Sequence, residues 1–263
     1  MARETIGARH PLLTSIRKAT LKGTLTEDGY CVAESFHLLD EALRSGREVK
    51  TILAAESVEP TVERRVKGLH GTRVLTVPDP LFAQVATTET SQGVLALVQP
   101  PRWTLDELFG GQPLVVVLDA LQDPGNAGAI VRAAEAFGAS GILCVKGTVS
   151  LWNPKALRAS AGSLFRVPFL QGMEAGLVSA ALAQRRVEIY AAVPQGGRSL
   201  HAVDLTRPSA VLIGGEAHGV RPALRSGACD LHIPTLGVES LNAGLAAGIL
   251  LYEAHRQRSV AAL

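Results

Sequence analysis

The sequence predicts an α/β protein in two parts, and three observations lead to this expectation. Segments with strand patterns and segments with helix patterns alternate along both halves of the chain. Residues 115–145 contain a complete unit of strand, polar loop, helix and strand, and its spacing suits a crossover helix between parallel strands. The run QPPR at 99–102 interrupts the alternation, so we place a domain boundary between residues 100 and 112.

Length and composition are those of a globular protein. The 263 residues are enough for one large or two modest domains, and 47% of them are hydrophobic while 19% are charged. The net charge of +2 neither favours nor excludes a nucleic-acid partner. Apolar stretches such as 246–252 are shorter than the roughly 20 residues that cross a bilayer. The first ten residues, MARETIGARH, lack the apolar segment of a signal peptide, so we expect a cytoplasmic protein without a membrane span.

Cysteine and histidine spacing favours neither a disulfide framework nor a metal site. The three cysteines, Cys31, Cys144 and Cys229, are widely separated and form no CxxC pair. The seven histidines are scattered as well. We therefore expect no metal.

The first half is expected to form a small α/β layer. It begins with a helix at 6–22 whose cations, including Arg17, Lys18 and Lys22, are typical of a solvated helix face. Strands then alternate with helices. The strands are expected at 30–33, 51–54, 73–77 and 94–98, and the helices at 36–44, 60–68 and 80–86.

The second half continues from the central unit with a similar alternation. Helices are expected at 153–164, which carries Lys155 and Arg158, and at 176–186, 222–227 and 242–257. Strands are expected at 188–193, 210–213 and 231–233. This order predicts a mainly parallel sheet with helices on both faces, and by itself suggests an open doubly wound sheet.

Three polar loops follow predicted strands, where open α/β sheets bind ligands. The first leads into a helix that carries Arg132, which faces either solvent or a site, and its glycines do not match the dinucleotide fingerprint. In the second, three glycines surround Glu216, as in a tight turn or a close approach to a ligand. In the third, Ser240 or Asn242 could cap the last helix.

Together these loops resemble the motifs of a known family. NAGAIVR at 126–132, GGEAHGV at 214–220 and IPTLGVESLNAG at 233–244 are similar to the three motifs of the SpoU family, within the knotted SPOUT superfamily. Its members are S-adenosylmethionine-dependent RNA 2′-O-ribose methyltransferases. The resemblance spans most of residues 112–258 and includes KALRASAGSLFRVP at 155–168. Members commonly have one more residue in the third motif, between Gly237 and Ser240.

The first half resembles the ribosomal-protein-L30-like substrate-binding domain of many members. Glu34 after the first expected strand and Gln92-Gly93 before the last carry this similarity. A glycine commonly follows the position of Glu34, whereas this chain has Ser35. The resemblance implies an RNA substrate-binding domain at 1–105 and a catalytic domain at 112–263 that ends in a trefoil knot and forms a homodimer.

The resemblance also implies roles for individual residues. Arg132 would be the key catalytic residue, although a guanidinium stays protonated, so we expect it to hold a phosphate or orient the hydroxyl instead of acting as a base. Asn126, Glu216, Ser240 and Asn242 would position the reactants. The cofactor-binding residues would be Ile213, Gly214, Gly215, Ile233, Leu236 and Leu241, and the RNA-binding residues Arg17, Lys18, Lys22, Lys155 and Arg158.

The expected function is methyl transfer from S-adenosylmethionine to a ribose 2′-hydroxyl of structured RNA. We favour 23S ribosomal RNA because the L30-like extension resembles that of ribosomal-RNA enzymes, whereas tRNA-specific members often lack it. A tRNA 2′-O-methyltransferase is one alternative. A non-catalytic RNA-binding module of the same fold and a nicotinamide-dependent oxidoreductase are the others.

Overall fold

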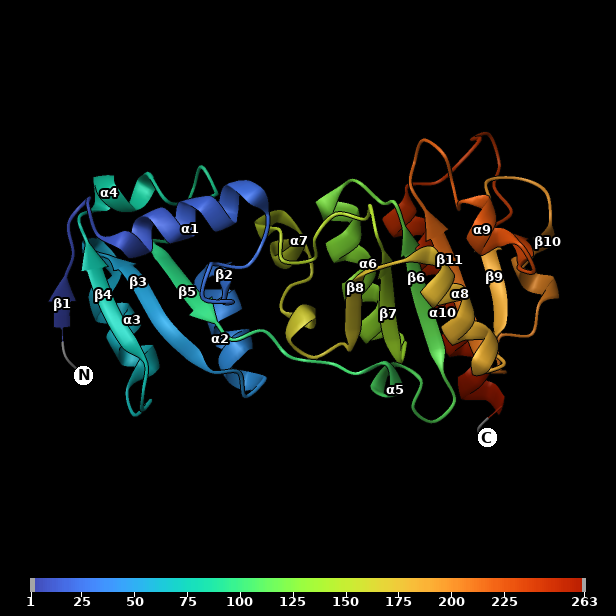
Figure 1. The fold of residues 1–263 in the computed structure, drawn as a ribbon, viewed down its shortest axis with the longest axis horizontal. Coiled ribbons are helices and arrows are strands. Elements are labelled where there is room, and N and C mark those ends of the chain that lie inside the picture. Colours follow the sequence, from blue (N-terminus) through green and yellow to red (C-terminus); the bar gives the residue numbers. More distant parts are fainter. Residues whose placement is uncertain (1–2, 262–263) are drawn as a thin grey trace. The chain divides into compact units, whose positions relative to one another are not determined.

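The computed structural model describes residues 3–261, and its chain divides into two compact units (Figure 1). The first comprises the chain up to Pro101 together with Trp152–Phe165. The second comprises Arg102–Leu151 and the chain from Arg166 onward. The sequence-based division differs, because it assigned all of 112–263 to the second domain. The outer ends of the expected domains, residues 1–2 and 262–263, lie outside the described residues.

The first unit is a five-stranded mixed sheet in the order β1-β4-β3-β5-β2, with β5 antiparallel to both of its neighbours. Its strands are β1 (Arg3–Thr5), β2 (Cys31–Glu34), β3 (Val49–Ala55), β4 (Arg73–Val77) and β5 (Val94–Val98). Its helices are α1 (Pro11–Lys22), α2 (Phe36–Arg44), α3 (Glu59–Val66), α4 (Asp79–Ala83) and α7 (Pro154–Ala159), with short 3₁₀ turns at Glu56–Val58 and Ser163–Phe165.

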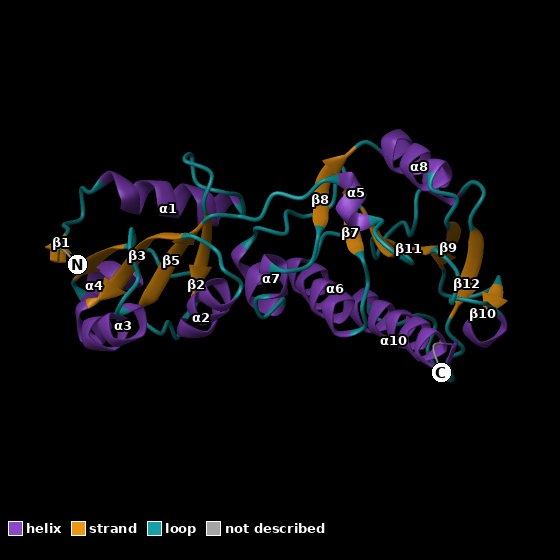
Figure 2. Cartoon of the chain, turned by 90° about the horizontal axis from the view of Figure 1, so that it is seen from below, coloured by secondary structure: helices purple, strands orange, loops and turns teal. Residues whose placement is uncertain are grey.

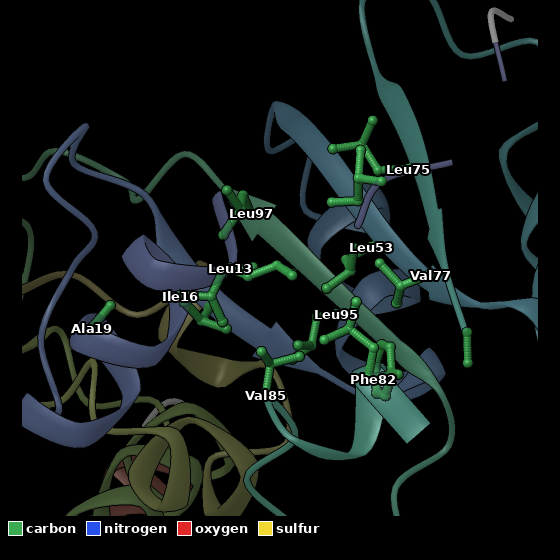
Figure 3. Close-up of a cluster of buried hydrophobic side chains, with 14 residues drawn as sticks. Leu13, Ile16, Ala19, Leu53, Leu75, Val77, Phe82, Val85, Leu95 and Leu97 are labelled. Carbon is green, nitrogen blue, oxygen red and sulfur yellow. The ribbon is translucent and has the colours of Figure 1, made fainter. Parts of the chain in front are cut away.

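Helices α1 and α4 bury their apolar faces on one side of this sheet. Leu13 and Ile16 of α1 pack with Phe82 of α4 over Leu53 and Leu95 of the sheet, as Figure 3 shows. Helix α1 was expected from residue 6 but begins at Pro11, because proline favours the first helical position and His10 accepts a hydrogen bond from Leu12 N. Gly23, with φ +64°, ends the helix.

Helix α7 packs against β2 and belongs to the first unit. It was expected to reach residue 164 but ends at Ala159, because Ala161 and Gly162 adopt left-handed φ values of 48° and 90°. Arg158 donates to Thr87 Oγ1 at 2.6 Å and lies 4.0 Å from a carboxylate oxygen of Glu34. This cation is therefore already engaged within the unit.

Glu34 is a buried carboxylate with several hydrogen-bond donors around it. Its side chain is only 3% exposed, and it accepts hydrogen bonds from Thr87 N at 2.8 Å and Thr88 Oγ1 at 2.7 Å. Burial raises the pKa of Glu34, but the hydrogen bonds from Thr87, Thr88 and Ser91 outweigh this effect and leave the pKa below its ordinary value. The unit therefore stabilises the ionised form.

The second unit is a seven-stranded sheet in which all neighbours are parallel, in the order β10-β12-β9-β11-β6-β7-β8. The strands are β6 (Leu114–Asp119), β7 (Gly141–Val145), β8 (Phe169–Met173), β9 (Glu188–Ala192), β10 (Arg198–Ser199), β11 (Ser209–Gly214) and β12 (Cys229–His232). The helices are α5 (Leu105–Leu108), α6 (Pro124–Ala136), α8 (Ala175–Gln184), α9 (Pro222–Arg225) and α10 (Ala243–Ala261), and a 3₁₀ turn spans Leu200–Ala202.

Helices cover both faces of the parallel sheet. Helices α6 and α10 pack against each other on one face, while α5 and α8 lie on the opposite side (Figure 2). Leu108 of α5, Val178 of α8 and Leu224 of α9 share one buried cluster with alternate residues of the central strands. Within the described residues no helix is long and apolar enough to cross a membrane.

The expected α/β class, the parallel sheet and the smaller N-terminal α/β unit are confirmed, while the knot stays a prediction. Strands β1, β8 and β10 were not expected. Strand β8 reads FLQGM, includes Gly172 with φ +75°, and lies at a sheet edge, so it lacks a buried strand's apolar pattern. Strand β10 has only two residues, and β1 only three.

Replacing Ser35 by glycine should stabilise the protein. Ser35 has φ 128° and ψ 156°, a region almost restricted to glycine, and the strain costs about 1–3 kcal/mol. Its hydroxyl accepts a hydrogen bond from Leu38 N, but replacing a serine cap by glycine costs only roughly a few tenths of a kcal/mol. Urea unfolding of Ser35→Gly should therefore give a higher free energy of unfolding. Ser45→Gly, at the other end of α2 with φ −81°, is the control and should destabilise; equal effects would contradict the strain.

Candidate active site

The three polar loops meet at one edge of the second unit's sheet. Because every strand is parallel, the carboxyl ends of β6, β11 and β12 share that edge, where α/β sheets bind ligands. Strand β11 lies directly beside β6, and the register pairs Gly214 with Asp119, the last residues of the two strands. The first and second loops therefore start next to each other.

A pocket of about 360 Å³ lies at this edge. Its apolar walls come from Ile213, Leu231, Ile233 and Leu250, and backbone from Gly214 and Gly215 also lines it. The polar side chains that line it are Glu216, Thr235, Ser240 and Asn242, and residues 192–194, at the end of β9, line it as well. The pocket thus combines apolar surface with polar groups from two different loops.

Side chains from all three loops are joined by hydrogen bonds. Asn242 Nδ2 donates to Asn126 Oδ1 at 2.9 Å, and Asn126 Nδ2 donates to Glu216 Oε1 at 2.7 Å. Asp123 caps α6 and fixes Asn126 by accepting its backbone N–H at 2.7 Å. Asn242 also accepts from Leu245 N at 3.1 Å, so it caps α10 and points its amide nitrogen at Asn126.

The glycines of the second loop are required by close backbone packing. A Cβ at Gly214 would lie 2.0 Å from the carbonyl carbon of Gly219, and one at Gly215 would lie 2.5 Å from Ala120 O. Gly219 N donates to Gly215 O at 2.8 Å and closes the loop. Only glycine fits at positions 214 and 215. The sequence GGE therefore fixes the place at the sheet edge where the chain presents Glu216.

Arg132 lies on α6 with its side chain exposed. It makes no hydrogen bond or ion pair with any residue between 3 and 261, in contrast to Asn126 on the same helix. Ala129, one turn earlier, faces the start of α10, since a Cβ at Gly244 would lie 3.4 Å from Ala129 Cβ. The guanidinium is therefore available to a ligand that approaches this edge.

Most of the residues proposed from the sequence come together here. Those that line the pocket are Ile213, Gly214, Gly215, Glu216, Ile233, Ser240, Leu241 and Asn242, and Asn126 joins them through its hydrogen bonds. Leu236 lies outside the lining and is 99% exposed. Asp119 and Arg221, which form an ion pair under the second loop, were not proposed; a carboxylate ending an apolar strand was the available signal.

The cations proposed to bind RNA belong to the first unit. Lys22 and Lys155 are exposed, Lys18 pairs with Glu27 at 3.1 Å, and Arg17 donates to Gln84 Oε1 at 3.0 Å. Arg158 is half-buried against Thr87, as described above. Within the described residues, no group of three or more His, Cys, Asp or Glu side chains is arranged to hold a metal ion.

Two family models match the chain, one for each half. The model of the SpoU rRNA methylase family matches residues 113–252, and that of the MRM3-like substrate-binding domain matches residues 14–96. The 23S rRNA (guanosine(2553)-2′-O)-methyltransferase RlmP of Bacillus subtilis is 30% identical over 93% of this chain and 96% of its own length.

Solved structures agree with these matches. The SpoU methyltransferase AviRb from Streptomyces viridochromogenes, in complex with AdoMet, superposes with a TM-score of 0.85 and 27% identity over 95% of this chain and 99% of its own. A structure described for 2-OH methylation of C/U34 on tRNA gives a TM-score of 0.53 at 28% identity, over 98% of its own chain but only 57% of this one. With its three motifs joined at one pocket and both halves matched, the chain belongs to the SpoU rRNA methylase family.

Proposed function

We propose that this chain methylates 23S ribosomal RNA at a ribose 2′-hydroxyl and that the pocket of the second unit is the site. Membership of the SpoU family makes the chain an S-adenosylmethionine-dependent RNA ribose 2′-O-methyltransferase. The observation that carries the site assignment is the hydrogen-bonded series Asn242, Asn126 and Glu216, which joins all three motifs beside the pocket.

The pocket suits the cofactor in size and chemistry. Its volume of about 360 Å³ falls among small-molecule sites, which span about 300–1,000 Å³. Ile213, Ile233 and Leu241 offer apolar surface for a flat base, and Gly214 and Gly215 bring backbone close to a ligand. S-adenosylmethionine supplies an electrophilic methyl group on a sulfonium when it is bound. We therefore propose that these five residues hold it.

Catalysis by this site rests mainly on alignment. Methyl transfer needs the ribose oxygen in line with the carbon that it attacks, and correct positioning supplies a large part of the acceleration. We assign Asn126, Glu216, Ser240 and Asn242 to fix that geometry, because the last three line the pocket and Asn126 is hydrogen-bonded to two of them. The planar guanidinium of Arg132 makes no hydrogen bond or ion pair within residues 3–261, so we assign it to the phosphate or the hydroxyl of the acceptor nucleotide.

The first unit is proposed to hold the RNA, in agreement with the substrate-binding family model that matches it. Arg17, Lys18, Lys22 and Lys155 are the cations proposed for phosphate contacts. Arg158, proposed with them from the sequence, also donates to Thr87 and lies near Glu34 within the unit. The tRNA-methylation structure matches only 57% of this chain, whereas the 23S rRNA methyltransferase RlmP matches 93% of it, which favours ribosomal RNA over tRNA.

An assay with radiolabelled S-adenosylmethionine tests this function. The acceptors are ribosomal RNA and total tRNA from a strain that lacks the gene. Label should enter 23S ribosomal RNA, and digestion should release a 2′-O-methylated nucleoside, identified by mass spectrometry. Label confined to tRNA would support the alternative substrate, and cofactor binding with no transfer to either RNA would support a non-catalytic module.

Arg132→Ala should lower turnover without weakening the binding of the cofactor. The expected fall in kcat is on the order of a hundredfold, because the acceptor loses its orienting group. The dissociation constant of S-adenosylmethionine, measured by calorimetry, should stay close to that of the wild type. Arg207→Ala, which removes an exposed arginine paired with Glu188, is the control and should change neither quantity. Nearly full activity of Arg132→Lys would show that a point charge suffices and that the planar fork has no role.

Asn126→Asp should impair the enzyme most at high pH. The new carboxylate cannot donate to Glu216, and two ionised carboxylates at this distance repel each other. A shared proton at low pH would restore one hydrogen bond, so the ratio of variant to wild-type kcat should increase as the pH falls. Asn153→Asp is the control, because it adds the same charge at the cap of α7, where aspartate serves as well as asparagine. A ratio independent of pH would contradict the role of the Asn126–Glu216 bond.

The family resemblance alone suggests the knot and the homodimer, and we propose both for the second unit. Leu245 and Tyr252 lie seven residues apart on α10 and are 55% and 53% exposed, which provides apolar surface for a second copy. Light scattering should show a dimer at micromolar concentration for the wild type and a monomer for Leu245→Glu/Tyr252→Glu. Leu177→Glu, at an equally exposed leucine on α8, should remain dimeric. A wild type that is monomeric and active would refute the dimer.

A further inference from the structure

An ion pair between a buried carboxylate and a partly exposed arginine lies beneath the second loop and takes no direct part in the chemistry proposed above. Asp119, the last residue of β6, is 1% exposed. Its Oδ2 accepts a hydrogen bond from the backbone N–H of Arg221 at 2.8 Å, and its Oδ1 lies 2.6 Å from Arg221 Nε. Asp119 is not among the residues that line the pocket.

Asp119 holds both ends of the loop that carries Glu216. Its backbone carbonyl accepts a hydrogen bond from Gly215 N at 2.8 Å, while its carboxylate binds Arg221 at the far end. Between these anchors the Gly219–Gly215 hydrogen bond closes the loop. Glu216 therefore extends from a loop whose two ends are fixed to one residue of a central strand.

Asp119 also lies only a few residues before the start of α6, the helix that carries Asn126. Only residues 120–122 separate Asp119 from Asp123, the cap that holds the backbone of Asn126. This short connection is itself fixed, because Ala120 N donates to Thr148 Oγ1 at 3.0 Å. Both partners of the Asn126–Glu216 bond are thus positioned from Asp119.

Arg221 also contacts the loop that follows β7. Its Nη2 donates to Lys146 O at 3.2 Å, directly after β7. The guanidinium therefore connects the carboxyl ends of β6, β7 and β11, which are adjacent strands of the sheet. A change at this ion pair reaches the first and second motifs together.

We propose that Asp119 is a positioning residue of the methyl-transfer site, acting through Arg221 on the loop 215–221. The proposal rests on the function proposed above. Loss of the carboxylate loosens the loop, so Gly214 and Gly215 hold the cofactor less well and Glu216 moves away from Asn126. Cofactor affinity and turnover fall together, while binding of RNA by the first unit does not change.

Asp119→Asn is the informative variant. Asparagine keeps the shape and can still accept from Arg221 N, but it loses the charge that holds Nε. The side chain of Arg221 is 36% exposed, so its charge stays hydrated and no buried ion is left alone. Arg221→Met would instead strand the buried carboxylate of Asp119, and a general loss of folding would say nothing about positioning.

The experiment compares full-length wild type, Asp119→Asn and Asp106→Asn at a temperature where circular dichroism shows all three folded. Asp106 lies on α5 and pairs with Arg185 at the end of α8. Helix α5 precedes β6, so it lies at the edge of the sheet opposite to the pocket. In Asp119→Asn, the dissociation constant of S-adenosylmethionine should rise and kcat should fall, each by on the order of tenfold to a hundredfold. The KM for RNA should stay at the wild-type value. Asp106→Asn should match the wild type throughout.

A neutral pair separates positioning from general stability. In Asp119→Asn/Arg221→Gln, the new amide can donate to asparagine Oδ1 and rejoin the loop to β6, so kcat should recover in part. Cofactor affinity and kcat of Asp119→Asn equal to those of Asp106→Asn would overturn the proposal, even with a lower melting temperature. A folded double variant without recovery would overturn it as well. If the wild type itself fails to bind S-adenosylmethionine, the proposed function is wrong, and that result is separate from either outcome.

Discussion

The parallel pairing of β6 with β11 is the contact on which the site depends. It places the last residues of the two strands, Asp119 and Gly214, side by side, so the loops that follow must leave the sheet together. Asn126 and Glu216 are 90 residues apart in the chain, yet they are joined by a hydrogen bond of 2.7 Å. A one-residue slip of this pairing would move the side chains of one strand to the opposite face of the sheet, and both faces are packed against helices, so the hydrophobic core also fixes the geometry of the polar groups.

Hydrogen bonds between the polar side chains then fix the orientations of the residues that the strands bring together. Asn242 has one carbonyl oxygen and one amide nitrogen, and the helix α10 uses the oxygen as its cap. Only the nitrogen remains to meet Asn126, which in turn must donate to Glu216. The directions of the hydrogen bonds are therefore fixed from the helix end to the carboxylate. The alternatives raised for Asn242, a cap or a site residue, are both satisfied by one side chain.

The first unit depends on a segment that the sequence places in the other half. Helix α7 packs on β2, and Arg158 reaches the hydrogen-bonded group around the buried Glu34. A charged residue at 3% exposure is tolerated because Thr87 and Thr88 donate to it. The strained Ser35, with φ 128°, follows directly. Buried charge and backbone strain thus occur side by side at the end of β2.

Local patterns in the sequence were enough to predict the α/β class, most helices and strands, and the three motifs, because hydrophobic periodicity and glycine-rich turns are local properties. Helix α2 and strands β4 and β5 were predicted with the bounds that the structure shows. Edge strand β8 was missed, since a strand with little buried surface needs no apolar alternation. Three features became visible only in the folded chain: α7 belongs to the first unit, Leu236 lies outside the pocket lining, and Asp119 binds Arg221. Each depends on contacts between residues distant in the chain, which local patterns do not encode.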